Sequence, residues 1–261
     1  MKQQDIKALK IWFSDYVSRY LKNNLEYDYA IKLKKDHTER VCKNIIQLGK
    51  DLNLSEQDML LAETIALFHD LGRFRQYAEY GTFKDADSEN HAKLSVKELV
   101  LNKVLANCSS AERKTVVKAV AWHNALALPK DIDEKDLFFM KLIRDADKLD
   151  IWGVFAALYK DKKHNSIVEL GLPDIPVCSE KAIDSFTQKH MVRLEDIKTL
   201  NDFKLLQLSW IYDINFKESL VIANQRKDLD IISDSLPRSE KLDRAVQAAR
   251  KYLLTSIPLR N

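Results

Sequence analysis

Two adjacent residues, His69 and Asp70, place an imidazole and a carboxylate at the end of a hydrophobic run. Both groups are ligands of divalent transition metals, and neither suits an apolar core. A single His-Asp dipeptide is a weak indication of a metal site. It gains weight here because further residues of the same types occur along the chain at His37, His91, His123 and Asp147.

The elements that must position these residues are predicted by the spacing of apolar side chains. Residues 6–20 have the pattern of an opening amphipathic helix, and a second stripe over residues 29–48 includes His37, which therefore points inward. Ser55 is a suitable N-cap for a mostly apolar helix that ends at His69 and Asp70, where Gly72 is expected to stop it.

Further helices are expected to carry the next candidates. Ser88 is predicted to cap a helix that begins near His91. Ser110 is predicted to cap another, which carries His123 on its apolar face before Pro129 prevents any continuation. Both histidines are therefore placed near the ends of helices.

A longer helix, capped by Asp133, is expected to carry Asp147. Residues three, four and seven positions from Asp147 are hydrophobic, which puts it on the apolar side of that helix. Asp145 is close in sequence to Lys141 and Lys148, and it is expected to be a surface acid or to lie behind a ligand.

The composition favours an all-α fold. Of 261 residues 46% are hydrophobic, which is enough for a large core, and only five glycines and five prolines occur, far fewer than an all-β fold with many tight turns would use. The helical pattern weakens after about residue 164, although Ser179, Asn201 and Ser239 mark further helix starts. We expect a helical core over residues 1–164 and a helical C-terminal extension over residues 165–261, packed on the core or forming a small satellite domain.

Charge and cysteine content limit the classes of partner. The 42 basic and 39 acidic residues are interspersed, so no strong nucleic-acid signal is present. No uncharged run approaches the roughly 20 residues of a membrane span, and no signal-peptide pattern begins the chain. Three widely spaced cysteines form no CxxC pair. We expect a cytoplasmic protein without a membrane partner, and no feature predicts its oligomeric state.

Inward-facing ionisable side chains are costly without partners, since each unsatisfied buried polar group costs on the order of 1–3 kcal/mol and a bare carboxylate more. For a single buried histidine a hydrogen-bonded core role is the common one, but a shared metal ion would satisfy the whole set. Four ligands would come from His37, His69, Asp70 and Asp147. His91 and His123 could complete a second site, with Asp70 bridging two metals. His164 and His190 have polar neighbours and are expected to be solvated.

The order of His37, His69, Asp70 and Asp147 along the chain resembles the signature of the HD-domain superfamily of metal-dependent phosphohydrolases. Residues 68–74 (FHDLGRF) resemble its central motif, and residues 145–150 (DADKLD) resemble its closing motif, in which the second aspartate, here Asp147, binds metal. The resemblance covers roughly residues 30 to 160, and no second recognisable domain accompanies it. His91 and His123 match the extra histidines of members that hold two metals.

The resemblance implies one or two divalent ions (Mn, Mg, Fe, Ni or Zn) and a small phosphorylated substrate, such as a nucleotide or phosphodiester. Metal binding lowers the pKa of water from 15.7 toward about 7, which supplies hydroxide for attack on phosphorus. Asp70 would act as bridge or base, while Lys148 and Arg73 would offset charge on the phosphoryl oxygens. Arg73 could instead be structural, and Lys148 could pair with Asp145 or Asp150.

Two other functions fit the same residues. A few members of the superfamily with the full ligand set hold two irons and cleave carbon-carbon or carbon-phosphorus bonds with dioxygen, and ligand types do not separate iron from manganese. A non-catalytic HD protein that only binds a ligand is the third alternative. Degenerate members of that kind usually lose part of the ligand set, which this chain retains.

Overall fold

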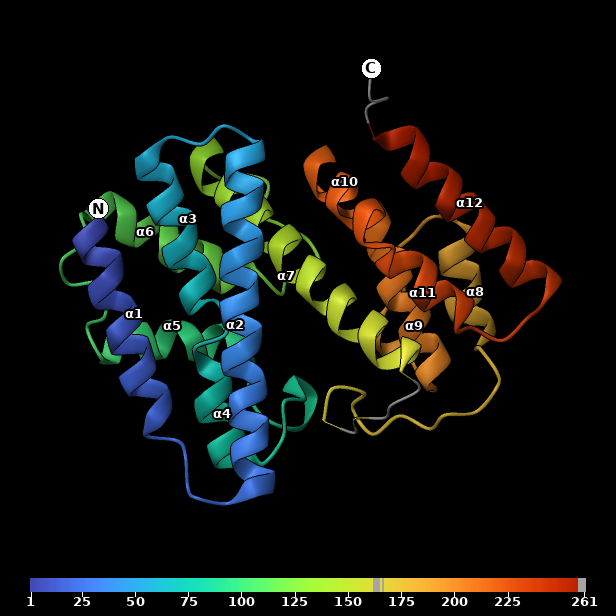
Figure 1. The fold of residues 1–261 in the computed structure, drawn as a ribbon, viewed down its shortest axis with the longest axis horizontal. Helices are drawn as coiled ribbons and strands as arrows, with labels where there is room; N and C mark the ends of the chain where they lie inside the picture. Colours follow the sequence, from blue (N-terminus) through green and yellow to red (C-terminus); the bar gives the residue numbers. More distant parts are fainter. Residues whose placement is uncertain (162–164, 166, 258–261) are drawn as a thin grey trace. The chain divides into compact units, whose positions relative to one another are not determined.

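The computed structural model describes residues 1–161, 165 and 167–257. All regular elements within these residues are helices, which confirms the predicted all-α fold (Figure 1). Their bounds are α1 Gln3–Ser18, α2 Leu25–Asp51, α3 Glu56–Phe68, α4 Gly72–Tyr80, η1 Asp85–Asp87, α5 His91–Leu101, α6 Ser110–Trp122, α7 Glu134–Lys160, α8 Glu180–Thr187, η2 Leu194–Asp196, α9 Leu200–Ser209, η3 Trp210–Asp213, α10 Lys217–Arg226, α11 Asp228–Asp234 and α12 Glu240–Ser256.

The chain forms two compact units, Met1–Asp147 and Lys148–Asn261. The division falls inside α7, whereas the sequence pattern placed a boundary at residues 164 and 165. The spacing of apolar residues indicates where a helix ends. It does not indicate where the packing partners change along one continuous helix, because the periodicity stays the same there. Packing of the C-terminal extension on the core, or its separation as a satellite domain, stays a prediction.

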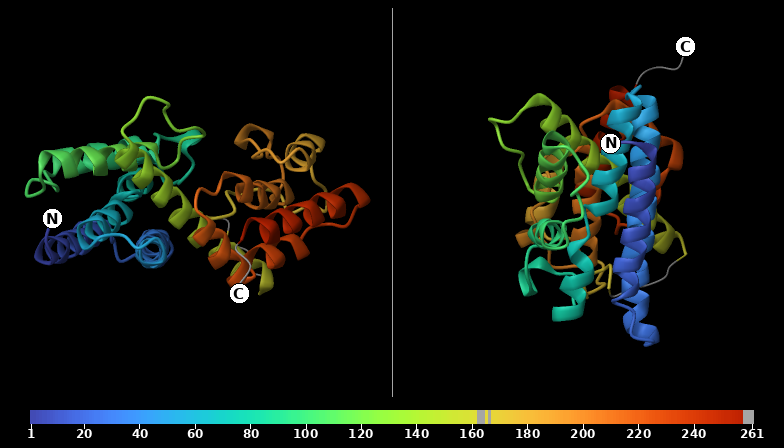
Figure 2. Two further views of the ribbon diagram at one scale, coloured as in Figure 1. Left: turned by 90° about the horizontal axis from the view of Figure 1, so that it is seen from above. Right: turned by 90° about the vertical axis from the view of Figure 1, so that its left-hand side faces the viewer.

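The first unit is organised around α3, whose residues 60–68 are all buried. Helix α3 packs against α1, α2 and α6, and α5 packs between α4 and α6. Figure 1 and the right-hand view of Figure 2 show α2 and α3 side by side. The predicted apolar face of α1 is confirmed, because Phe13 and Tyr16 are buried and contact the rings of Phe68 and Phe74. The unit thus surrounds the end of α3 with helices on several sides.

Several predicted helix starts are confirmed. The hydroxyl of Ser55 accepts a hydrogen bond from the amide of Asp58, and Oδ1 of Asp133 accepts one from the amide of Lys135 at 2.9 Å. Ser179 and Ser239 occupy the N-cap positions of α8 and α12. These residues satisfy or flank amides that have no partner inside the helix.

Other predicted caps are wrong by one or two residues. Asn90, not Ser88, caps α5, and its side chain accepts from the amide of Lys93 at 3.0 Å. Ser109 caps α6 in place of Ser110, and Thr199 caps α9 where Asn201 was expected to mark the start. Neighbouring polar residues are all suitable caps, so the sequence alone does not choose among them.

Helix α3 ends at Phe68 with His69 as its C-cap, as predicted, and Gly72 then begins the next helix, α4. A Cβ at this position would lie 2.4 Å from the amide nitrogen of Ser95 and 2.5 Å from the carbonyl oxygen of His91. The amide of Gly72 also donates to the hydroxyl of Ser95 at 2.8 Å, and that hydroxyl donates to the carbonyl of His69 at 2.8 Å. Glycine is therefore required because the turn after α3 touches the backbone of α5.

Replacing Gly72 with alanine is expected to lower the free energy of unfolding by about 2 kcal/mol or more, because backbone atoms of α5 cannot yield to a Cβ as a flexible side chain would. Urea denaturation measures this difference. The matched control is Gly153→Ala in α7, where the nearest atom to the added Cβ is 3.9 Å away. That variant should be neutral or more stable by about 0.5–1 kcal/mol. Equal stabilities of the two variants would contradict the close approach.

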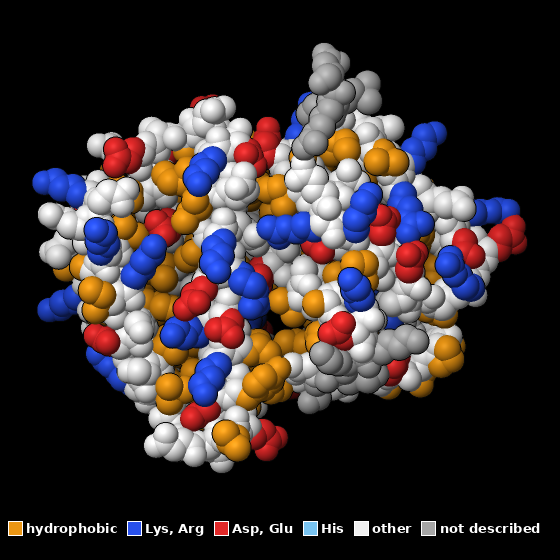
Figure 3. Space-filling view, in the orientation of Figure 1, with side chains coloured by type: hydrophobic (Ala, Val, Ile, Leu, Met, Phe, Trp, Pro, Cys, Tyr) orange, Lys and Arg blue, Asp and Glu red, His pale blue; other side chains and the backbone are white. Residues whose placement is uncertain are grey.

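The second unit contains the end of α7 and helices α8 to α12. Its core includes Trp152, Phe155, Phe186 and Phe203, and the indole of Trp152 donates to the carbonyl of Gln207 at 2.8 Å. On the face drawn in Figure 3, acidic and basic side chains are interspersed. Within the described residues, none of the helices combines the length and the apolar character that crossing a membrane would need.

Candidate metal centre

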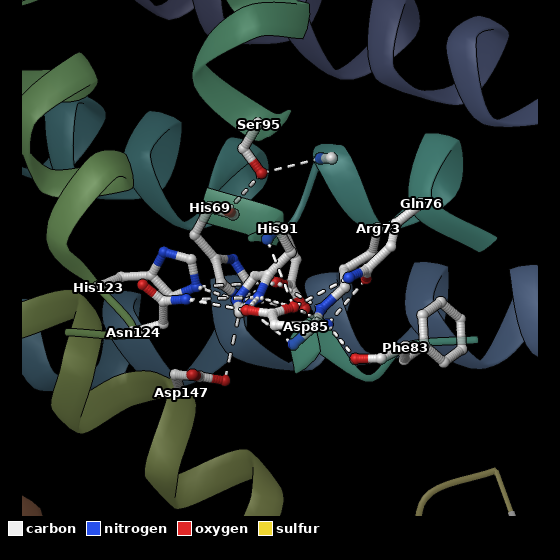
Figure 4. Close-up of polar contacts among 12 residues, drawn as sticks. His69, Arg73, Gln76, Phe83, Asp85, His91, Ser95, His123, Asn124 and Asp147 are labelled. Atoms are coloured by element: carbon white, nitrogen blue, oxygen red, sulfur yellow. Dashed lines mark hydrogen bonds and ion pairs between the residues drawn. The ribbon is translucent and has the colours of Figure 1, made fainter. Parts of the chain in front are cut away.

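The structure brings together all six residues that the sequence singled out as metal ligands, and every one lies in the first unit. His37 is in the middle of α2, His69 is the C-cap of α3 and Asp70 follows it. His91 is the first residue of α5, His123 is the C-cap of α6 and Asp147 lies within α7. Figure 4 shows the labelled histidines and Asp147 converging on one region. The six side chains thus come from the ends and interiors of five helices and lie close together.

One set of ligand atoms surrounds Oδ2 of Asp70. Nε2 of His37 lies 3.5 Å from this oxygen and 3.2 Å from Nε2 of His69. Oδ1 of Asp147 is 3.2 Å from Nε2 of His37 and 3.8 Å from Nε2 of His69. Each of the two carboxylates therefore lies within 3.8 Å of both imidazoles, and these groups are the ligands that transition metals accept.

A second set surrounds the other oxygen of the same carboxylate. Oδ1 of Asp70 lies 3.5 Å from Nε2 of His91 and 3.7 Å from Nε2 of His123, and these two nitrogens are 3.0 Å apart. The two carboxylate oxygens of Asp70 thus point to different groups of histidines. This geometry fits the expectation that Asp70 bridges two ions.

The tautomers of two histidines follow from their hydrogen bonds. Nδ1 of His69 lies 2.8 Å from the carbonyl oxygen of Ala66, and Nδ1 of His123 lies 2.8 Å from that of Val120. A carbonyl oxygen only accepts, so Nδ1 must carry the proton in both rings. The last carbonyls of a helix lack a partner within the helix, which is why a histidine at the C-cap can bind one three residues back. In both rings Nε2 is left with a free lone pair.

The tautomer of His91 also follows from its partner, because Nδ1 lies 2.7 Å and 2.9 Å from the two carboxylate oxygens of Asp85. A carboxylate also only accepts, so Nδ1 carries the proton and Nε2 carries the lone pair. The contact of 3.0 Å between Nε2 of His91 and Nε2 of His123 then brings two lone pairs together, and the guanidinium of Arg73 donates to Nε2 of His91 from 3.3 Å. A cation between them would turn this repulsion into coordination.

The residues present therefore fit a divalent metal. The ring nitrogens with lone pairs converge on one region, and the buried Oδ1 of Asp147 faces the ring nitrogens of His37 and His69. Imidazole nitrogens and carboxylate oxygens that meet in this way form the set of donors that transition metals accept. Three overlapping sets of ligand atoms, each within 4.8 Å of one another, can be drawn from these residues.

The electrostatic environment gives the ligands the protonation states that metal binding needs. Burial lowers the pKa of His69 to about 4, and burial together with the charge of Arg73 lowers the pKa of His91 to about 3, so both imidazoles are neutral at pH 7. Burial alone would raise the pKa of Asp70, but the charges of Lys34 and Arg73 hold it well below its usual range. Neutral imidazoles thus stand beside an ionised carboxylate.

Two cations lie near Asp70, one at each carboxylate oxygen. The ammonium of Lys34 lies 3.0 Å from Oδ2, and Nε of Arg73 lies 3.5 Å from Oδ1. Arg73 was expected from the sequence, but Lys34 was missed. Its signal was its position three residues before His37, which places both on one face of α2.

The other predicted functional residues have identified partners. Nζ of Lys148 lies 2.5 Å from Oδ2 of Asp213, and both residues belong to the second unit. The contact of Lys148 with phosphate stays a prediction. Asp145 is fully buried, so the first of its two expected positions, the surface, is wrong, and a position behind a ligand stays a prediction. The lysines near it in sequence suggested exposure, but the helix turns this residue inward.

The side chain of Asn124, the residue after His123, reaches Oδ2 of Asp85 at 3.4 Å. His190 is exposed, as expected, while His164 lies outside the described residues.

The aromatic side chains before His91 pack together. The rings of Tyr77 and Phe83 stack with centroids 4.8 Å apart, and Lys34 lies over the ring of Phe83 at 5.4 Å. Phe83 is buried, and its carbonyl accepts from Arg73 at 2.5 Å. These rings hold residues 81–90 close to the candidate ligands.

Comparisons with known proteins agree with this geometry. The model of the family described as HD domain matches residues 35–152, and the matched segment contains all six candidate ligands. Neither the comparison with curated proteins nor the comparison with solved structures gives a match.

Proposed function

Because this chain belongs to the HD-domain superfamily of metal-dependent phosphohydrolases, we propose that it hydrolyses a phosphate ester or anhydride of a small molecule. One observation carries the proposal: the two carboxylate oxygens of Asp70 face different pairs of histidines. A bridging carboxylate of this kind suits two ions that share one reacting phosphate.

The residues divide into two groups of ligands with Asp70 in common. His37, His69, Asp70 and Asp147 would hold one divalent ion, and Asp70, His91 and His123 would hold the second. A bound divalent ion supplies a water of lowered pKa and a positive charge for the phosphoryl oxygens. The ligand types suit Mn, Fe, Ni or Zn, and the carboxylates also suit Mg.

The cations beside Asp70 would bind the phosphoryl group. The ammonium of Lys34 donates to Oδ2 of Asp70 and retains further N–H donors for a phosphoryl oxygen. The guanidinium of Arg73 is held by the carbonyl of Phe83 and the carboxylate of Asp85, which fixes its charge near the same carboxylate. We propose Lys34 as a phosphate contact in addition to Arg73 and Lys148, since charge on the phosphoryl oxygens must be offset in the transition state.

The substrate class follows from the chemistry of the site. Ligands for two divalent ions and flanking cations favour an anionic substrate with a phosphate group, and a nucleotide or a phosphodiester meets this requirement. The site itself does not choose the rest of the substrate molecule. A panel of substrates is therefore the direct test.

We expect release of inorganic phosphate or of a phosphomonoester from at least one nucleotide or phosphodiester in a panel, with dependence on manganese, magnesium or another divalent ion. The protein should be purified without oxygen, its bound metals quantified, and phosphate release and oxygen uptake measured in parallel. Two irons per chain with oxygen consumption that depends on substrate would contradict the proposal and favour an oxygenase. Tight ligand binding without turnover would favour a binding protein.

A further inference from the structure

Asp85 contacts a candidate metal ligand from outside the ligand set. It lies in η1, within the segment of residues 81–90 that connects α4 to α5, and its carboxylate binds Nδ1 of His91 through both oxygens. Figure 4 shows Asp85 among the residues that converge on His91. The polar, aspartate-rich character of this segment did not single out Asp85 in the sequence.

Asp85 is itself held by three other side chains. Nε2 of Gln76 donates to Oδ1 at 2.9 Å, and the guanidinium of Arg73 donates to the same oxygen at 3.1 Å. The side chain of Asn124 lies 3.4 Å from Oδ2. Burial alone would raise the pKa of Asp85, but the hydrogen bond from His91 and the charge of Arg73 lower it to about 2. The carboxylate is thus ionised and fixed in orientation.

Gln76 joins the segment to α4 at further points. It is fully buried, and Nε2 also lies 2.8 Å from the hydroxyl of Ser88 and 2.9 Å from the carbonyl of Glu89. A buried amide that contacts three acceptors in one segment specifies the position of that segment. Asp85 is therefore placed on His91 by contacts that do not involve a metal.

His91 differs in this respect from His69 and His123. The rings of those two are oriented by backbone carbonyls of their own helices, three residues earlier. The ring of His91 is oriented by a carboxylate from a different segment. A carboxylate partner increases the basicity of an imidazole ligand more than a carbonyl does, and loss of such a partner typically weakens metal binding 10- to 100-fold.

We propose that Asp85 is a positioning residue that fixes the tautomer and orientation of His91 and so sets the metal affinity of the group formed by Asp70, His91 and His123. This inference rests on the proposed function only in that it uses the same two groups of ligands. Asp85 affects the affinity for one ion only. The affinity for the ion held by His37, His69 and Asp147 does not depend on Asp85. Residues 81–90 therefore govern one of the two metal positions.

The test is a titration of the metal-free full chain with Mn²⁺, with bound metal determined by equilibrium dialysis and heat by calorimetry. The wild-type chain is expected to bind two ions. Asp85→Ala is expected to weaken one binding step about 10- to 100-fold and to leave the other unchanged. Asp85→Asn retains an acceptor for Nδ1 and loses the charge, so its effect should be smaller than that of alanine.

Two control variants separate positioning from general loss of structure. Asp87→Asn removes an exposed carboxylate from the same short helix, which controls for local charge. Ser88→Ala removes a contact of Gln76 with the segment but does not touch His91. Asp87→Asn should bind two ions with wild-type affinities. Ser88→Ala should weaken the affected step far less than Asp85→Ala does, because Gln76 keeps its contacts with Asp85 and Glu89. The signal of two coupled manganese ions in electron paramagnetic resonance should persist in the controls and weaken in Asp85→Ala at matched metal concentration.

The outcomes distinguish this inference from the proposed function. Two ions bound by Asp85→Ala with wild-type affinity, or equal weakening of both steps, would overturn the positioning role. Equal weakening by Ser88→Ala would show that any loosening of the segment is sufficient, and would also overturn it. A wild-type chain that binds a single ion would overturn the positioning role alone, if that chain still releases phosphate. Two ions without phosphate release would overturn the function alone.

Discussion

Alanine in place of Asp70 is expected to reduce metal-dependent phosphate release by a factor of about 10³ or more, the largest loss of any single replacement in the site. Asp70 is a member of both ligand groups, so its removal weakens both metal positions at once. It also leaves Lys34 and Arg73 without the carboxylate that lies between them. Phosphate release and bound manganese should be measured on the same preparation.

The control for Asp70→Ala is a second buried carboxylate in the same unit. Asp136 is 4% exposed, and it accepts hydrogen bonds from Thr115 and Lys118, outside the ligand set. Asp136→Asn is expected to lower stability and to retain metal binding and activity. Retention of more than a tenth of the activity in Asp70→Ala, with two ions still bound, would contradict the bridging role.

Divalent metal is expected to stabilise the protein strongly against heat. An ion that binds only the folded state at a concentration 100 times its dissociation constant contributes about 2.7 kcal/mol. For a unit of this size that corresponds to an increase in Tm of about 5–10 °C. The increase arises because the ion relieves the repulsion between the convergent Nε2 atoms of His91 and His123 and binds the carboxylates of Asp70 and Asp147.

Thermal unfolding with and without Mn²⁺ measures this increase, and a chelator should reverse it. His69→Gln is the informative variant, because the fully buried ring of His69 contacts the ligand atoms of His37 and Asp147. Its Tm should respond much less to metal. His190→Gln, at an exposed position, should respond as the wild-type chain does. An unchanged Tm in the wild-type chain at millimolar Mn²⁺ would argue against a metal centre here.

The helical fold and the six candidate ligands were predictable from periodicity, residue type and the resemblance of the two motifs to a known family. His37 lies on the apolar stripe of its helix and is buried, as predicted. Apolar neighbours at helical spacing did not separate Asp147 from Asp145, because Asp145 is fully buried and the side chain of Asp147 is 19% exposed. Each of these signals is local. The outcome is a ligand set that the structure places in one region.

The features that the sequence did not reveal depend on contacts between distant segments. Gly72 is required because α5 approaches it, and nothing near Gly72 in sequence indicates this approach. Asp85 is one of several aspartates in its segment, and only the tertiary fold places it on His91. Asp145 is buried although lysines flank it. Contacts of this kind cannot be predicted from hydrophobic periodicity, because they depend on how distant segments pack against one another.

The bonds from His69 and His123 to carbonyls of their own helices bear on conformational entropy. A histidine that is free to rotate loses rotamer freedom when it binds a metal, and that loss opposes binding. These two rings are already ordered by bonds of 2.8 Å within their own helical turns. Little additional order is needed when an ion arrives or departs. One divalent ion should therefore be exchangeable for another in the folded protein, without unfolding of α3 or α6.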